Sequence, residues 1–154
     1  MTTIERVEIL QVDLPPKVVR TDAIQAFVTQ ETPIVRITCA DGVVGTGYTY
    51  TIGTGGSSVV ALLRDHLAPK LIGRDPECIE AIWKDLFFAT HATAVGAITS
   101  LALAAIDMAL WDALGRALGQ PVATLLGGAP RAVEAYDSFG LIDIKDDAKR
   151  LERA

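Results

Sequence analysis

The two carboxylates that most resemble a catalytic pair are Asp107 and Asp112, which lie in a strongly apolar stretch of the chain. Paired carboxylates can share a metal ion or divide acid and base roles. On a helix, this spacing is a rotation of about 500°, which leaves the side chains about 140° apart. We therefore expect no shared metal. Asp107 falls in line with Leu103 and Trp111, so we predict a buried, hydrogen-bonded structural acid rather than a catalytic one, and a core position for Trp111.

Two glycine-rich segments and one histidine are candidates for a phosphate-binding loop and for a metal ligand. Gly45-x-Gly47 and the cluster 53–56 could cradle a phosphate, but no Gly-Lys-Ser/Thr follows, and Gly45-x-Gly47 sits in a predicted strand rather than at a helix start. His91 has no His, Asp or Cys at ligand spacing. The sequence therefore predicts neither a nucleotide loop nor a metal site.

Composition excludes several kinds of partner. The net charge is -5, and no run of Lys or Arg provides a footprint for nucleic acid or an anionic membrane. The most apolar stretch, 92–106, is too short to cross a bilayer and suits a core helix. Cys39 and Cys78 fit no C-x-x-C pattern and are interpreted as small core hydrophobes of a reducing compartment. Charged residues at the N-terminus do not fit a secretory signal, so we expect a cytoplasmic protein.

The first part of the chain reads as strands. Alternating apolar residues predict a strand from Ile4 to Leu14, closed by Pro15-Pro16. Residues 16–32 lose this pattern and are interpreted as a long connection, of a length that is more often functional than idle. Asp41-Gly42 between two β-rich runs, 34–38 and 43–50, predicts a hairpin. The prediction is three antiparallel strands in chain order.

Helices follow the strands. Ser57 or Ser58 can N-cap a first helix, and Asp75-Pro76 can open a second. A third helix is predicted over roughly 95–118 with Gly119 as its C-cap, and a short one from Pro121 through Leu126. Strands first and helices after predict an α+β fold, a three-stranded antiparallel sheet followed by a helical bundle packed on one face. Beyond it, 133–137 reads as a strand and 143–154 as the start of a helix.

The stretch AAIDMALWDALGRALGQPVATLLGG, followed by RAVEAYDS, resembles the mandelate racemase/muconate lactonizing enzyme family of the enolase superfamily, in its mandelate racemase-like subgroup. The Ile-Asp-x-Ala-x-Trp-Asp pattern at 106–112 is its most specific part. The resemblance implies an N-terminal capping domain over 1–130 and the beginning of a C-terminal barrel domain over 131–154. A (β/α)₈ barrel needs about 250 residues, so only its first strand and the start of its first helix would be present.

Such enzymes, by resemblance, remove the proton next to a substrate carboxylate and stabilise the resulting enediolate with magnesium. The family's first base is expected in a Lys-x-Lys motif, which this sequence lacks, since Lys145 and Lys149 have the wrong spacing. We therefore expect no catalytic residue and no magnesium ligand in this chain. The function implied is the N-terminal part of a racemase or dehydratase, with cycloisomerase as a further family activity, acting on a hydroxy acid or sugar acid.

Substrate contacts are expected in two loops and at one strand end. By resemblance, the loop 49–58 lines the substrate pocket, which points to Tyr48, Tyr50 and Thr51; packing on the sheet is an equal alternative for Tyr48. The loop 17–32 offers Phe27 as an apolar wall. Ser138 would lie at the C-terminal end of the first barrel strand, where barrel enzymes place active-site groups. The resemblance implies that it hydrogen-bonds the substrate carboxylate; the alternative is a serine that starts a loop. Lys17 and Arg20 could meet a second carboxylate, although exposed basic loop residues are usually solvated.

Two readings compete with a fragment of an enzyme. Mean hydropathy of +0.33 allows a non-catalytic binding or oligomerisation module whose exposed apolar surface drives association. Alternatively, a separate chain could supply the barrel of a split enzyme. The expected partners are a small-molecule carboxylate and other copies of the chain in a homo-oligomer, without nucleic acid or membrane.

Overall fold

The main sheet has three antiparallel strands. The computed structural model describes residues 2–17, 19–21, 23–24, 26–93 and 96–135. Strands β1 (Ile4–Leu14), β4 (Gln30–Cys39) and β5 (Val44–Tyr48) pair in the order β1-β4-β5. Gly42 closes the β4–β5 hairpin at φ 86°, a conformation that glycine adopts without strain. The predicted antiparallel sheet and its Asp-Gly hairpin are confirmed.

The connection between β1 and β4 is more ordered than its sequence indicates. Strands β2 (Arg20–Thr21) and β3 (Ala26–Phe27) pair with each other as a small antiparallel ladder. Strand β4 already begins at Gln30, opposite Leu14, so the prediction of a connection reaching residue 32 is wrong at its end. Backbone pairing to β1 extends β4 through residues whose side chains show no alternation.

The first helical segment is short and changes its winding. Helix α1 (Gly56–Leu62) continues into a π-helical turn, η1 (Leu63–Leu67), and a 3₁₀ turn, η2 (Ala68–Lys70). The predicted serine N-cap is wrong, because Gly55 occupies that position and offers no side chain. The amide of Gly56 instead donates to a carboxylate from β4, at Glu31, 3.0 Å away.

Helix α2 (Ile79–Ala89) begins later than predicted. Asp75 Oδ1 accepts from the Glu77 amide at 2.9 Å and so closes a turn before the helix, whose N-cap is Cys78. This Cys78 is exposed, which corrects its predicted core position, whereas Cys39 is buried. A 3₁₀ turn, η3 (His91–Thr93), follows α2.

Helix α3 (Ala97–Leu118) is the long core helix. It ends at Gly119 in the left-handed conformation, as predicted, and the short helix α4 (Val122–Leu125) follows. Among the described helices, α3 alone is long and apolar enough to cross a membrane, by length and composition only. Its buried residues contact β5, β4, α1 and α2, which makes it a core helix of this fold.

Helix α3 lies unusually close to β5. A Cβ placed on Gly47 would sit 2.1 Å from the carbonyl oxygen of Ala105, and one on Gly45 would sit 2.1 Å from that of Ala109. Ala105, Ala109 and Ala113 share one face of α3 and are fully buried. Two glycines without side chains and three alanines with minimal ones therefore let the helix backbone touch the strand.

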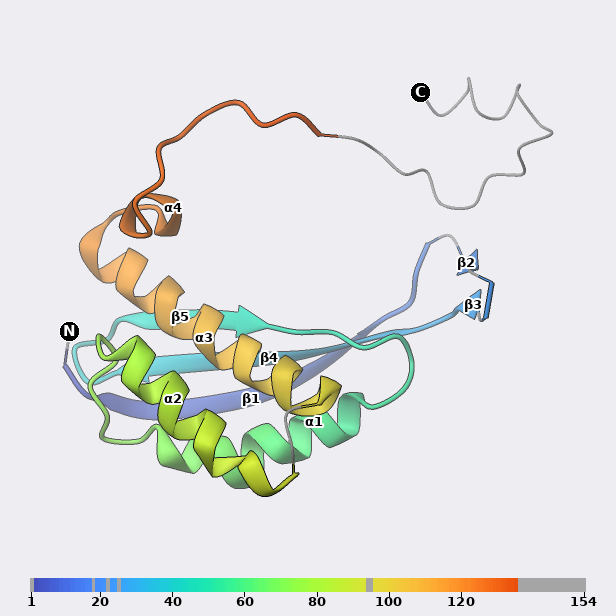
Figure 1. Ribbon diagram of the computed structural model, residues 1–154, viewed down its shortest axis with the longest axis horizontal. Helices are drawn as coiled ribbons and strands as arrows, with labels where there is room; N and C mark the ends of the chain where they lie inside the picture. The colour runs from blue at the N-terminus through green and yellow to red at the C-terminus, as the bar shows by residue number, and fades with distance from the viewer. Residues whose placement is uncertain (1, 18, 22, 25, 94–95, 136–154) are drawn as a thin grey trace.

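The pairing of residues across the sheet explains why α3 can approach β5 closely. Ile9, Val35 and Gly47 are register partners, so side-chain size falls to nothing at the strand beneath α3. Away from β5, larger buried residues of the sheet and of α1, η1 and α2 form the core. The buried cluster comprises Ile4, Val35, Ile37, Val59, Leu63, Leu67, Leu71, Ile79, Ile82, Leu86, Ala102, Leu103, Ala105, Ile106, Ala109 and Leu110. Figure 1 shows α1, α2 and α3 together on one face of the sheet.

A carboxylate fastens the same two elements. Asp112 Oδ2 on α3 accepts from the Thr46 amide of β5 at 2.9 Å and from Arg116 Nε at 2.8 Å. Since β5 is an edge strand of the described sheet, this amide has no strand partner on that side, and the helix carboxylate satisfies it. Asp112 is thus committed to structure.

Of the segment predicted to begin a barrel domain, 131–154, the structure describes residues 131–135. Residues 131–135 carry no strand, so the described start of the strand predicted over 133–137 is absent. The rest of that strand, Ser138 and the predicted helix 143–154 lie outside the described residues.

We expect Gly47→Ala to destabilise the fold by about 2–4 kcal/mol, because its methyl group would collide with the backbone of α3, which cannot move without opening the core. Urea unfolding of the 154-residue chain measures this. The matched control is Gly96→Ala, where an added Cβ meets nothing within 4 Å, and which should cost less than about 1 kcal/mol. Equal stability of the two variants would contradict the close approach.

Candidate functional site

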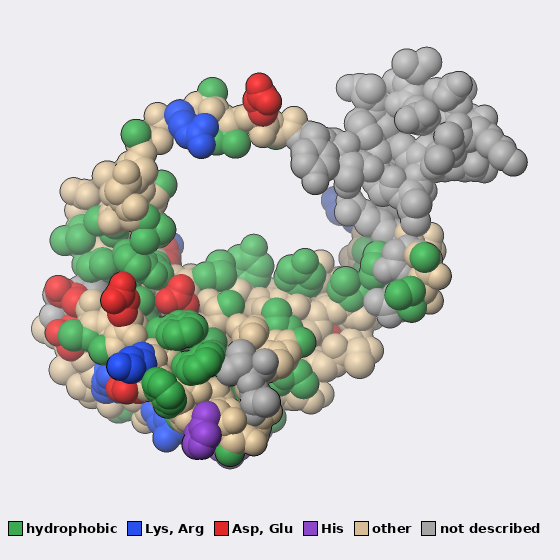
Figure 2. Space-filling model, viewed as in Figure 1, with side chains coloured by type: hydrophobic (Ala, Val, Ile, Leu, Met, Phe, Trp, Pro, Cys, Tyr) green, Lys and Arg blue, Asp and Glu red, His purple; other side chains and the backbone are tan. Residues whose placement is uncertain are grey.

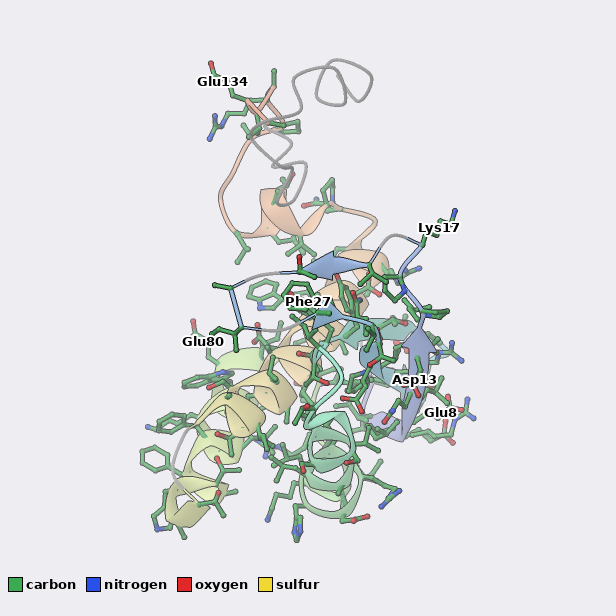
Figure 3. All side chains as sticks on the ribbon, turned by 90° about the vertical axis from the view of Figure 1, so that its right-hand side faces the viewer. Glu8, Asp13, Lys17, Phe27, Glu80 and Glu134 are labelled. Carbon is green, nitrogen blue, oxygen red and sulfur yellow. The ribbon has the colours of Figure 1, made fainter. Side chains whose placement is uncertain are left out.

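A cleft of about 540 Å³ opens where the end of β1, β3 and the segment after β5 come together. It contains two of the residues predicted to contact substrate, Phe27 and Tyr50. Figure 3 shows Phe27 on the β3 segment and Lys17 above it, with the amine of Lys17 pointing away from the molecule. The cleft is lined by Pro16, Lys17, Phe27, Thr29, Gln30, Tyr50 and Ile52.

The lining combines apolar walls with neutral polar groups. Phe27 is half-buried, whereas Tyr50 and Ile52 present 51% and 38% of their surface to solvent. Thr29 and Gln30 add hydrogen-bonding groups, and Lys17 is the one cation among the described residues of the lining. None of the described residues that line this cleft is Asp or Glu, so the charge in its described lining is positive.

The segment after β5 is held to β4 by Glu31. The backbones of Glu31 and Thr51 exchange two hydrogen bonds, at 3.1 Å and 2.9 Å. The Thr51 hydroxyl donates to Glu31 Oε2 at 2.5 Å, and the same oxygen accepts from the Gly56 amide at 3.0 Å. The hydroxyl of Thr51, a predicted substrate contact, is therefore turned toward Glu31.

Glu31 acts as the missing N-cap of α1. The helix begins after Gly55, which has no capping side chain, and a carboxylate near this end is favoured by the free amides and by the helix dipole. Glu31 thus positions both flanks of the loop 52–55, one of which carries Tyr50. Sequence reasoning missed this residue, because its partner amide lies far along the chain and no local pattern indicates it.

The remaining predicted contacts do not all meet in the cleft. Tyr48 lies opposite Ile34 in the β4–β5 ladder, is 52% exposed and does not line the cleft. Of the two predicted basic residues, Lys17 does line it. Ser138 and the side chain of Arg20 lie outside what the structure describes.

The described residues hold no metal site. Among residues 2–17, 19–21, 23–24, 26–93 and 96–135, no three His, Cys, Asp or Glu side chains come together as ligands. Asp112 binds the β5 amide, whereas Asp107 lines a groove toward α2, so the two do not face one site, as their spacing predicts. His91 is exposed, with Nδ1 2.7 Å from the carbonyl oxygen of Phe88.

Asp107 differs from its prediction. It is half-buried, but within the described part of the chain it has no hydrogen-bond or ion-pair partner, so the expected structural hydrogen bond is absent. Burial raises the pKa of this carboxyl group, because the charged form loses hydration. Trp111 packs against the core, as predicted, but it is only partly buried.

Comparison with known proteins gives the cleft its context. Residues 5–127 match the model of the mandelate racemase / muconate lactonizing enzyme N-terminal domain. The chain belongs to this family. The predicted resemblance is therefore confirmed, and so is the fold class of an enolase-superfamily capping domain.

Relatives within the mandelate racemase/muconate lactonizing enzyme family are enzymes. A D-galactonate dehydratase family member of Pseudarthrobacter chlorophenolicus is 39% identical over 129 residues, 83% of this chain and 31% of that protein. A 3,6-anhydro-alpha-L-galactonate cycloisomerase of Streptomyces coelicolor is 36% identical over 152 residues, 95% of this chain and 42% of that protein. The chain thus spans less than half the length of these relatives.

Solved structures in the family show the same arrangement. A racemase from Streptomyces coelicolor with bound magnesium has a TM-score of 0.89 at 33% identity, covering 97% of this chain and 43% of that one. An L-talarate dehydratase from Polaromonas complexed with Mg and L-glucarate has a TM-score of 0.87 at 29% identity, covering 98% and 44%. These neighbours carry magnesium.

We expect Glu31→Ala to loosen the loop 52–55 and lower the free energy of unfolding by about 1–3 kcal/mol, because two donors lose a charged acceptor. Protease digestion with mass-spectrometric mapping should show faster cleavage after Tyr50. Glu31→Gln keeps one acceptor oxygen, so its free energy of unfolding should lie between those of the parent and of Glu31→Ala. The control Glu5→Ala, at an exposed position of β1, should change stability by less than about 0.5 kcal/mol. Unchanged cleavage in Glu31→Ala would rule out this anchor.

Asp107→Asn is expected to stabilise the chain at pH 7, by less than about 1 kcal/mol because the carboxyl group is only partly buried. Because the pKa of Asp107 is higher in the folded than in the unfolded chain, the free energy of unfolding falls as the pH rises from the unfolded-state pKa through the folded-state pKa. The advantage of the variant should therefore shrink below about pH 4, where the parent carboxyl is protonated. Thermal melts across pH measure this. Asp85→Asn, which breaks an ion pair with Arg74, should give no gain; a matching gain there would contradict the prediction.

Proposed function

We propose that residues 1–130 are the capping domain, and 131–154 the start of the barrel domain, of a magnesium-dependent racemase or dehydratase. The enzyme would remove the proton next to the carboxylate of a hydroxy acid or sugar acid. The single observation that carries this is the cleft formed by Phe27, Tyr50 and their neighbours, in a chain of the mandelate racemase/muconate lactonizing enzyme family. Names of its relatives include dehydratases of galactonate and mannonate.

In this proposal the cleft recognises the substrate part that does not react. Phe27 and Ile52 form an apolar wall that excludes water, while Thr29, Gln30 and the Tyr50 hydroxyl bond substrate hydroxyls. Lys17 at the rim would meet a second carboxylate in a diacid, which supports a choice between monoacids and diacids at this position. Ser138 would hydrogen-bond the reacting carboxylate, and Thr51 would help through its anchorage on Glu31.

In this proposal the catalytic groups belong to the barrel domain, of which residues 131–154 would form the start. The described residues offer no magnesium ligand set, so no catalytic step is assigned to them. The chain alone would be inactive and would serve by closing the substrate off and fixing its orientation. We further propose a cytoplasmic homo-oligomer, in keeping with two cysteines that form no disulfide.

A hybrid enzyme tests the proposal. Residues 1–154 would replace the matching N-terminal part of the Streptomyces coelicolor cycloisomerase, with which they align over 152 residues. We expect the hybrid to exchange the proton next to the carboxylate of at least one sugar acid for deuterium in D₂O, dependent on magnesium, as followed by NMR. The isolated chain should exchange none.

Two substitutions in that hybrid separate recognition from folding. Phe27→Ala should raise KM about tenfold with a smaller effect on kcat, because it removes apolar contact with a part of the substrate that does not react. Ser138→Ala should lower kcat/KM, whereas Glu5→Ala should leave both unchanged. Exchange by the isolated chain, or a folded hybrid that exchanges no acid, would overturn the proposed function.

A further inference from the structure

A second hollow lies between α2 and α3. It is a groove of about 430 Å³, and its lining differs entirely from that of the cleft at β3. Figure 2 shows hydrophobic side chains gathered over α2 and α3, with acidic side chains beside them. The groove is lined by Ile79, Glu80, Trp83, Asp107 and Trp111.

Two indole rings border the groove, and both tryptophans of the chain are among its lining residues. Trp83 is 43% exposed, a large fraction for a tryptophan, although its ring stacks on Phe87 at 5.1 Å between centroids and 19° between planes. Phe87 in turn meets Phe88 edge-on at 5.8 Å. This aromatic row holds Trp83 in place and leaves part of its ring for a ligand.

Two carboxylates complete the lining, and no basic side chain belongs to it. Asp107 extends from the middle of α3, half-buried, and has no partner within the described residues. Burial also raises the pKa of its carboxyl group, which reports the cost of keeping a charge there without a counter-ion. A cation bound beside Asp107 would offset this loss of hydration.

We propose that this groove binds the guanidinium group of an arginine side chain presented by a partner protein. A planar cation can stack on an exposed indole while its N–H groups donate to a carboxylate, which an ammonium ion does less well. Asp107, Glu80 and the indoles of Trp83 and Trp111 line the same groove, so the two kinds of interacting group lie together there. Charge complementarity therefore identifies the occupant: a cationic, flat group, in a groove whose own lining has only negative charge.

The composition of the chain makes a direct test possible. Because Trp83 and Trp111 are its only tryptophans, the two indole N–H signals in a ¹⁵N NMR spectrum both report on the groove. Titration of the 154-residue chain with N-acetylarginine amide should shift both signals in a saturable way, at concentrations on the order of millimolar, as for a single cation–π contact with one ion pair. N-acetylcitrulline amide, the same shape without charge, should bind at least tenfold more weakly.

Two variants identify the groups. Asp107→Asn should weaken arginine binding at least fivefold while the chain stays folded, and Trp83→Leu should weaken it while Trp111 still reports. Asp85→Asn, also on α2 but outside the lining, should bind as the parent does. Equal binding of arginine and citrulline amides, or Asp107→Asn binding as the parent, would overturn the proposal, and so would an absence of saturable shifts. None of these outcomes touches the proposed function, since the groove shares no residue with the cleft.

Discussion

The contact on which this fold depends is the backbone-to-backbone approach of α3 and β5. Gly45 and Gly47 leave no side chain between them and the alanine face of the helix. Close approach of this kind gains dispersion energy over many atoms at once, but tolerates no added methyl group. Asp112 then adds a hydrogen bond from the helix to the free edge of the strand. The direction of α3, and therefore the position of everything that follows it, is set by this interface.

The opposite end of the same strand carries the candidate site. As β5 leaves the sheet, its backbone pairs once more with Glu31, whose carboxylate binds Thr51 and the first amide of α1. A single side chain thereby joins strand, loop and helix, and it leaves Tyr50 beside Phe27. The sheet and the segment that lines the cleft are therefore linked through one partly buried acid.

The cleft at β3 and the groove between α2 and α3 differ in the charges of their described lining residues. Among its described lining residues, the cleft at β3 has one cation and no acid. The groove at α2 and α3 has two acids, no cation and two indoles. Because the charges of these two linings are opposite, the two sites would attract ligands of opposite charge.

Local patterns in the sequence determined the order of strands and helices, the Asp41-Gly42 hairpin, the Gly119 cap and the family, because alternation, helical spacing and turn residues act over a few neighbouring positions. The same patterns failed where distant segments decide. Ser57 and Ser58 suggest a cap that Glu31 supplies, and Asp107 suggests a core hydrogen bond that the fold does not form. Nothing near Gly45 and Gly47 in the sequence indicates the α3 backbone that packs on them. Only the tertiary structure could decide these, since the partner of each lies tens of residues away or, for Asp107, is missing from the described chain.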